Sequence, residues 1–272
     1  MKACLAQRLR LWSLITLLFC AWQPGFCAWQ LSVQTAPIPV RHIKGTIHGF
    51  LDLRSEDGHV IASGDLIQIA RGSQVNSRMV FTFKDGSIDD ETTVYSQRHN
   101  FQLITYHHLQ KGPAFPHPID LLIDARSGAV TVTSTGKDGK QETKTDHLKL
   151  PPDLANGMVS SIVENIGPGA SETRIPVLVT TPSPRLVTLS IASRSEEPFS
   201  LAGASRKAIH YEVKIELGGV AGIVAPMIGK QPPNIQIWVI GGQAPCFLKE
   251  TGPLYQDGPV TTIQLASPTW TD

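Results

Sequence analysis

The chain has 272 residues, and its 24 basic and 23 acidic side chains give a formal net charge of +1. With 41% hydrophobic residues it is long enough and apolar enough to bury a substantial core. The balanced charge, without a basic run, argues against nucleic acid or an anionic membrane as a partner. After the first 28 residues no apolar stretch approaches the roughly 18 residues that a membrane-spanning helix needs, so we expect no transmembrane segment in the mature chain.

The first 28 residues have the organisation of a secretory signal peptide. Three basic side chains precede an apolar stretch from Leu11 to Trp22, and a small-residue cleavage site follows at residues 25–28. We therefore expect residues 1–28 to be removed and residues 29–272 to form a single β-rich domain. The mature protein is then exported, to a periplasm or to the extracellular space, and soluble.

The cysteines support this interpretation. Cys4, Cys20 and Cys27 all lie in the segment that we expect to be removed, which leaves Cys246 alone. A single thiol cannot form an internal disulfide, so the fold must depend on its hydrophobic core. Phe26 stands where a lipoprotein would carry a small residue before Cys27, which favours an unanchored product.

Alternation of apolar and polar residues dominates the rest of the chain. It is clearest over residues 207–217, where Tyr211, Val213 and Ile215 share one face and polar side chains such as Lys214 take the other. This period of two is typical of strands with one buried and one solvated face, and it favours an antiparallel sheet.

Turn signals separate the strands. Pairs such as Asp57-Gly58 and Asp85-Gly86 lie between candidate strands, and glycine supplies the positive φ that tight hairpins require. We count about a dozen short strands. The fold class predicted is mainly β, with a large antiparallel sheet curled into an incomplete barrel or a sandwich.

One segment departs from this pattern. Leu154, Met158 and Ile162 are spaced as on one face of a helix, after a proline at residue 152 and before Gly167-Pro168. We expect one inserted helix over about residues 152–166.

Histidines and aspartates near residue 110 are the densest group of metal-capable side chains. If residues 99–109 form a strand, His107 and His108 point to opposite faces. His108 with His117 and Asp120 is then one possible three-ligand set, with an open position for a metal-activated water. Solvated or hydrogen-bonded histidines are the favoured alternative.

Asp89, Asp90 and Glu91 form a consecutive acidic triple. Neighbours on a strand alternate between faces and cannot converge without a bulge. We interpret the triple as a solvated charge run that protects a sheet edge.

The run from Val220 to Ile228 is apolar except for glycine and proline, although it connects two strands. An apolar connection must be buried, cover a cavity or meet an apolar partner. We predict that it either plugs the end of the sheet or encloses a pocket. The residues expected to bind a ligand are Val220, Ile223, Ile228, Trp238 and Tyr211.

The closing part of the chain resembles a known architecture. A strand over residues 208–217, the Gly218-Gly219 turn and the candidate strands at 235–239 and 247–250 are similar to the end of the half-barrel of the outer-membrane lipoprotein carrier family. The resemblance implies a concave apolar face that receives acyl chains. It rests on layout, offers no motif residues to transfer, and fits an uncharacterised family of exported bacterial β-rich proteins.

These observations favour an exported, noncatalytic binding or carrier protein for an apolar or lipid-like ligand, with no cofactor. No Gly-x-Ser-x-Gly elbow or nucleotide-binding loop occurs. The alternatives are a metal-assisted hydrolase at the His108, His117 and Asp120 region, and a structural envelope protein with a protein partner. The oligomeric state is not predicted.

Overall fold

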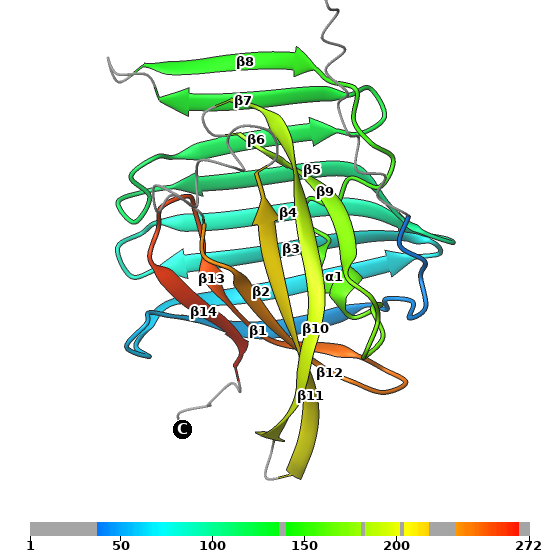
Figure 1. Cartoon of the computed structure of the whole chain (residues 1–272). Coiled ribbons are helices and arrows are strands. Elements are labelled where there is room, and N and C mark those ends of the chain that lie inside the picture. The colour runs from blue at the N-terminus through cyan, green and yellow to red at the C-terminus, as the bar shows by residue number, and fades with distance from the viewer. Residues whose placement is uncertain (1–36, 136–139, 181–182, 202–203, 218–231, 267–272) are drawn as a thin grey trace, which may run out of the picture. The chain divides into compact units, whose positions relative to one another are not determined.

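The alternating pattern forms one antiparallel sheet of 14 strands, shown in Figure 1. The structure is a computed structural model that describes residues 37–135, 140–180, 183–201, 204–217 and 232–266. These residues all belong to one compact unit, Thr35–Asp272. The strands are β1 (Ile47–Arg54), β2 (Val60–Arg71), β3 (Gln74–Phe83), β4 (Ile88–Gln97), β5 (Phe101–Lys111), β6 (Ile119–Asp124), β7 (Ala129–Thr135), β8 (Gln141–His147), β9 (Thr173–Val179), β10 (Arg185–Leu201), β11 (Ala204–Glu216), β12 (Ile235–Ile240), β13 (Cys246–Pro253) and β14 (Val260–Leu265).

The sheet consists of two meanders. Strands β1 to β8 pair in chain order, strands β9 to β14 do the same, and the two series are joined where β1 pairs with β14. Strands β8 and β9 are the two free edges, so the sheet does not close into a barrel. This confirms the prediction of a mainly β fold built on a large antiparallel sheet that stays incomplete as a barrel.

The segment between the meanders packs inside the curl of the sheet. It contains one short helix, α1 (Val159–Val163), drawn between the two meanders in Figure 1. Tyr95 of β4 contacts Ser161 with 3.2 Å between their hydroxyl oxygens, and the Tyr211 hydroxyl of β11 donates to the carbonyl of Ile166 at 2.5 Å. Because β4 and β11 belong to different meanders, the segment bridges them and fills the interior.

The helix is shorter than expected. The apolar positions predicted for its packing face are buried, with Leu154, Met158 and Ile162 no more than 2% exposed. Only residues 159–163 are α-helical, however, because Gly157 has a φ of +67° and belongs to a turn. The left-handed backbone at Gly157 interrupts the helix that apolar spacing alone suggests over residues 152–166.

Residues 41–44, which precede β1, bind this segment through hydrogen bonds and an ion pair. The backbone N–H groups of Arg41 and His42 both donate to Asn165 Oδ1 at 2.7 Å. Lys44 forms an ion pair with Glu164, and its backbone exchanges two hydrogen bonds with the buried side chain of Gln97. The start of the unit is thereby tied to both the helix and β4.

The faces of β11 match the sequence prediction. Tyr211 and Val213 are fully buried and Lys214 is exposed. Val213 lies opposite Ile191 of β10 and Ile235 of β12, so it occupies the centre of an apolar row across three strands.

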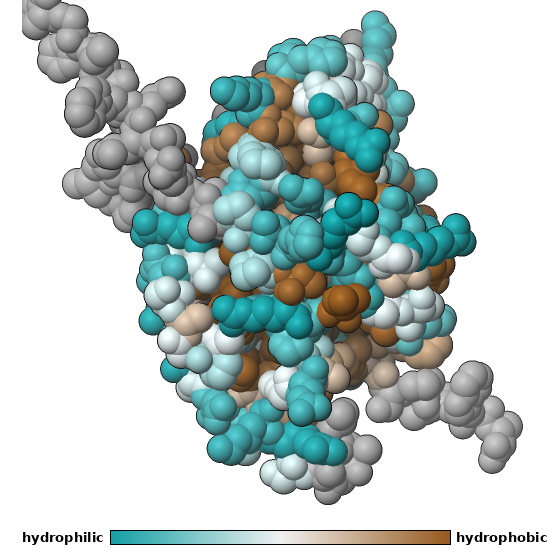
Figure 2. Space-filling view, turned by 90° about the vertical axis from the view of Figure 1, so that its right-hand side faces the viewer, coloured by the Kyte–Doolittle hydropathy of each residue, from teal (hydrophilic) through white to brown (hydrophobic). Residues whose placement is uncertain are grey.

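On the face seen in Figure 2, hydrophobic groups are interspersed with hydrophilic side chains. Some large apolar side chains of the unit are exposed; they are Ile43, Ile47, Phe50, Ile67, Ile69, Leu122 and Leu186. No helix within the described part of the chain is both long and apolar enough to cross a membrane.

Candidate functional site

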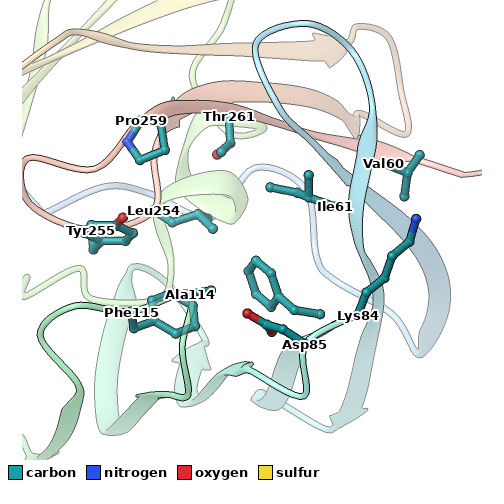
Figure 3. Close-up of a pocket in the computed structure, with 11 residues that line it drawn as sticks. Val60, Ile61, Lys84, Asp85, Ala114, Phe115, Leu254, Tyr255, Pro259 and Thr261 are labelled. Atoms are coloured by element: carbon teal, nitrogen blue, oxygen red, sulfur yellow. The ribbon is translucent and has the colours of Figure 1, made fainter.

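Three hairpin loops meet around a pocket of about 470 Å³. The β3–β4 turn contributes Lys84 and Asp85, the β5–β6 loop contributes Ala114 and Phe115, and the β13–β14 loop also lines the pocket (Figure 3). The other lining residues are Val60, Ile61, Phe83, Leu254, Tyr255, Pro259 and Thr261. The volume lies within the range typical of small-molecule sites, about 300 to 1,000 Å³.

Local geometry holds two of these loops together. The backbone N–H of Ala114 donates to Ser87 Oγ at 2.9 Å, which joins the β5–β6 loop to the β3–β4 turn. Gly112 permits this approach: its φ is +106°, and a Cβ there would stand 2.5 Å from Ser87 Oγ. The position therefore requires glycine on both conformational and steric grounds.

Aromatic side chains form one wall of the pocket. Phe115 packs edge-on against Phe83, with ring centroids 5.4 Å apart, and against Tyr255 at 5.8 Å. Edge-to-face pairs of this kind are favourable beyond their simple burial. The lining is thus mainly apolar, with Lys84 and Asp85 as its charged members.

A second, smaller pocket of about 120 Å³ adjoins the first, since Leu254 lines both. Its lining is different in character, because it includes the ionisable residues Asp89, Glu91, His108 and Glu250. Glu91 of β4 lies directly opposite His108 of β5 on the inner face of the sheet. Glu250 comes from β13, in the other meander.

Hydrogen bonds fix most of this cluster. His108 Nε2 lies 2.8 Å from Asp89 Oδ1, and Gln110 Nε2 donates both to Asp89 Oδ2 at 3.1 Å and to the carbonyl of Leu254 at 3.0 Å. The Tyr106 hydroxyl donates to Glu91 Oε1 at 2.7 Å. Gln110 therefore connects the acidic cluster to Leu254, which lines both pockets.

The surroundings shift the pKa of three groups. Burial, reinforced by the charge of Glu91, raises the pKa of Glu250 from 4.5 to about 7. Burial and the neighbouring Glu91 carboxylate also raise the pKa of Tyr106 well above its ordinary value. For His108 burial acts to lower the pKa, but the hydrogen bond that it donates to Asp89 and the charges of the Glu91 and Asp90 carboxylates outweigh it, and the net shift is upward. His108 is thus stabilised as a cation beside Asp89.

The expected metal ligands do not converge. Asp120 lies on the outer face beside His107, with 2.8 Å between His107 Nε2 and Asp120 Oδ1, whereas His108 points inward to Asp89. His117 is exposed on the β5–β6 loop. Over the described ranges, no group of three or more His, Cys, Asp or Glu side chains has an arrangement that could hold a metal ion.

The two described residues of the expected ligand-binding set, Tyr211 and Trp238, lie on opposite faces of the sheet. Tyr211 faces inward, fully buried, while its strand neighbour His210 stacks on Trp238 on the outer face, with ring centroids 4.5 Å apart. Trp238 Nε1 also donates to Glu197 Oε2 at 2.8 Å, and the Lys249 ammonium lies 3.8 Å from the Trp238 ring centroid. Val220, Ile223 and Ile228 lie outside the described residues.

The acidic triple Asp89, Asp90 and Glu91 lies on an interior strand of the sheet, β4. Its alternation is as expected, since Asp90 points outward to Arg78 at 2.6 Å while Asp89 and Glu91 line the inner pocket. The edge assignment is wrong, because β4 pairs with β3 and β5 on either side. The signal for an inward-facing acid pair was present in the alternation, but only the fold shows which face is inside.

No protein-family model matches this chain, and no curated protein matches it in sequence. Among solved structures, the chain is similar to a β-barrel-like protein of the domain of unknown function DUF1849 from Brucella abortus. The identity is 11%, the TM-score is 0.46, and the match covers 85% of this chain and 100% of that chain.

Proposed function

We propose that this protein is a noncatalytic binding or carrier protein that holds the apolar body of a small amphipathic molecule in the pocket between its three loops. The observation that carries the proposal is the mainly apolar pocket of about 470 Å³ with its aromatic wall of Phe83, Phe115 and Tyr255. Apolar ligands gain affinity by leaving water for such a site. The carrier-family resemblance, which implies acyl-chain binding, supports the same class of ligand.

Isothermal titration with 1-octanol and 1-hexanol tests the proposal. Each buried methylene contributes about 0.8 kcal/mol, so 1-octanol should bind roughly tenfold more tightly than 1-hexanol. Absence of saturable binding of either alcohol would contradict the proposal.

A substitution that fills the pocket tests whether the alcohol binds there. Ala114→Trp places a large side chain at the pocket lining and should weaken 1-octanol binding at least tenfold. Ala244→Trp, at an exposed position in the β12–β13 connection, makes the same change elsewhere and should leave binding intact. Equal effects of the two variants would place the ligand outside this pocket.

We further propose that the protein acts after export, with the first 28 residues removed. The support is the order of basic, apolar and small residues at the N-terminus. Mass spectrometry of the mature protein should find a chain that begins near Ala28 without an acyl group on Cys27. Retention of the first 28 residues would overturn this proposal without affecting the pocket.

A further inference from the structure

The small inner pocket is lined by more carboxyl groups than the stability of the fold requires. Its ionisable lining comes from strands on both sides of the curl: Asp89 and Glu91 from β4, His108 from β5 and Glu250 from β13. Met79, Phe81 and Ile263 supply apolar lining from β3 and β14. The pocket adjoins the apolar pocket, because Leu254 lines both.

Glu250 differs from the other members of the cluster. Both carboxylate oxygens of Asp89 have hydrogen-bond partners, and Glu91 accepts from Tyr106. Among the described residues, no hydrogen bond or ion pair is found for the Glu250 carboxyl group, and its strand neighbours across the sheet are Ile237 and Ile263. The Glu250 side chain is only partly exposed. Desolvating a carboxylate without a partner is costly, and an apolar residue between two isoleucines would stabilise the fold more.

The charges in the pocket favour a cation. The net upward shift of the His108 pKa favours its cationic form beside Asp89 and Glu91, so one positive charge faces three carboxyl groups in this pocket. The Tyr106 hydroxyl donates a hydrogen bond to Glu91 but brings no charge. An ammonium group offers three donors and one positive charge, which suits the free acceptor positions of two carboxylates.

We propose that this acidic chamber, defined by Asp89, Glu91, His108 and Glu250, binds the ammonium group of an amphipathic amine whose apolar body occupies the adjoining pocket. The inference rests on the proposed function, because the apolar pocket must hold the rest of the molecule. It adds the chemical class of the ligand: a primary amine with an apolar chain.

Three probes of equal chain length test the charge preference by titration calorimetry. At pH 8.5 octylamine should bind at least tenfold more tightly than 1-octanol, and octanoate should bind more weakly than 1-octanol because the chamber repels anions. At pH 5.5 protonation of Glu250 should reduce the advantage of octylamine over 1-octanol several-fold. Asp89, Glu91, His108 and Tyr106 are the other titratable groups that face the chamber.

Two variants locate the effect. Glu250→Gln keeps the shape of the side chain and should abolish the preference for octylamine over 1-octanol. Glu212→Gln makes the same change on β11, where the carboxylate is paired with Arg194, and should preserve the preference.

The outcomes separate the two proposals. If 1-octanol binds but octylamine shows no advantage, or if the advantage survives Glu250→Gln, the amine proposal is overturned and the apolar pocket stands. If none of the three probes binds, the proposed function itself fails. Thermal unfolding of each variant shows whether a loss of binding reflects loss of the fold.

Discussion

Replacing Glu250 with Gln should make the protein more stable at alkaline pH and leave its stability at acidic pH nearly unchanged. The reason is that burial and the nearby Glu91 raise the pKa of Glu250 from 4.5 to about 7 in the folded state. In the unfolded chain both influences are lost. Folding therefore favours the protonated carboxyl group, and ionisation opposes folding.

The direction and size of the effect follow from the two pKa values. Below pH 4.5 the carboxyl group is neutral in both states and does not affect stability. Between pH 4.5 and about 7 the unfolded state ionises first, so the free energy of unfolding falls as the pH rises. Since one pH unit corresponds to about 1.4 kcal/mol, the wild type should lose about 3 kcal/mol relative to Glu250→Gln by pH 8.

Urea unfolding of both proteins between pH 4 and pH 8.5 measures this difference. Glu212→Gln is the matched control of opposite sign. The hydrogen bond from Arg194 lowers the pKa of Glu212 despite some desolvation, so its carboxylate stabilises the fold above its unfolded pKa and that contribution is lost as the pH falls. A constant difference between wild type and Glu250→Gln over the whole pH range would refute the burial of an ionisable carboxyl group in the inner pocket.

Further substitutions test the interior. Gly157→Ala should cost about 2 to 4 kcal/mol in unfolding experiments, because φ is +67° and the new Cβ would lie 1.9 Å from Thr93 Oγ1. The control Gly72→Ala has a similar φ but open space around it and should cost only about 1 kcal/mol. Equal losses of stability in the two variants would exclude the steric contribution at Gly157. Val213→Ala should cost about 1 to 3 kcal/mol through lost burial and cavity formation, whereas Lys214→Ala on the opposite face should cost well under about 1 kcal/mol. Equal shifts of the unfolding temperature for the two variants would mean that the faces of β11 are wrongly assigned.

The strands could be predicted because their signal is local. Residues 207–217 alternate along the chain, and the corresponding strand β11 buries Tyr211 and Val213 as expected. The turns at Gly58 and Gly86 have the positive φ that their Asp-Gly pairs indicate. In each case neighbouring residues alone determine the conformation, so no knowledge of the fold is needed.

The inserted helix shows where local patterns become insufficient. Leu154, Met158 and Ile162 are buried in the hydrophobic core, and helical spacing identifies them correctly. The spacing of apolar residues nevertheless indicates which side chains are buried, and it does not determine the backbone conformation of the segment. Gly157 packs against Thr93 and Tyr106 of the sheet, and this contact selects a turn where a helix was expected.

The site escaped prediction because distant strands assemble it. Asp89 and His108 are separated by one hairpin, but Glu250 reaches them only after the second meander has folded back along β1. The inner face of β4 is enclosed because β1 pairs with β14. The sequences of these two strands do not predict that pairing. The same carboxylates on an edge strand would be solvated and unremarkable. Enclosure changes their chemistry, because it desolvates Glu250 and brings it near Glu91. In a sheet that curls without closing, an acidic residue at an inward position of a central strand is therefore a candidate for ligand binding.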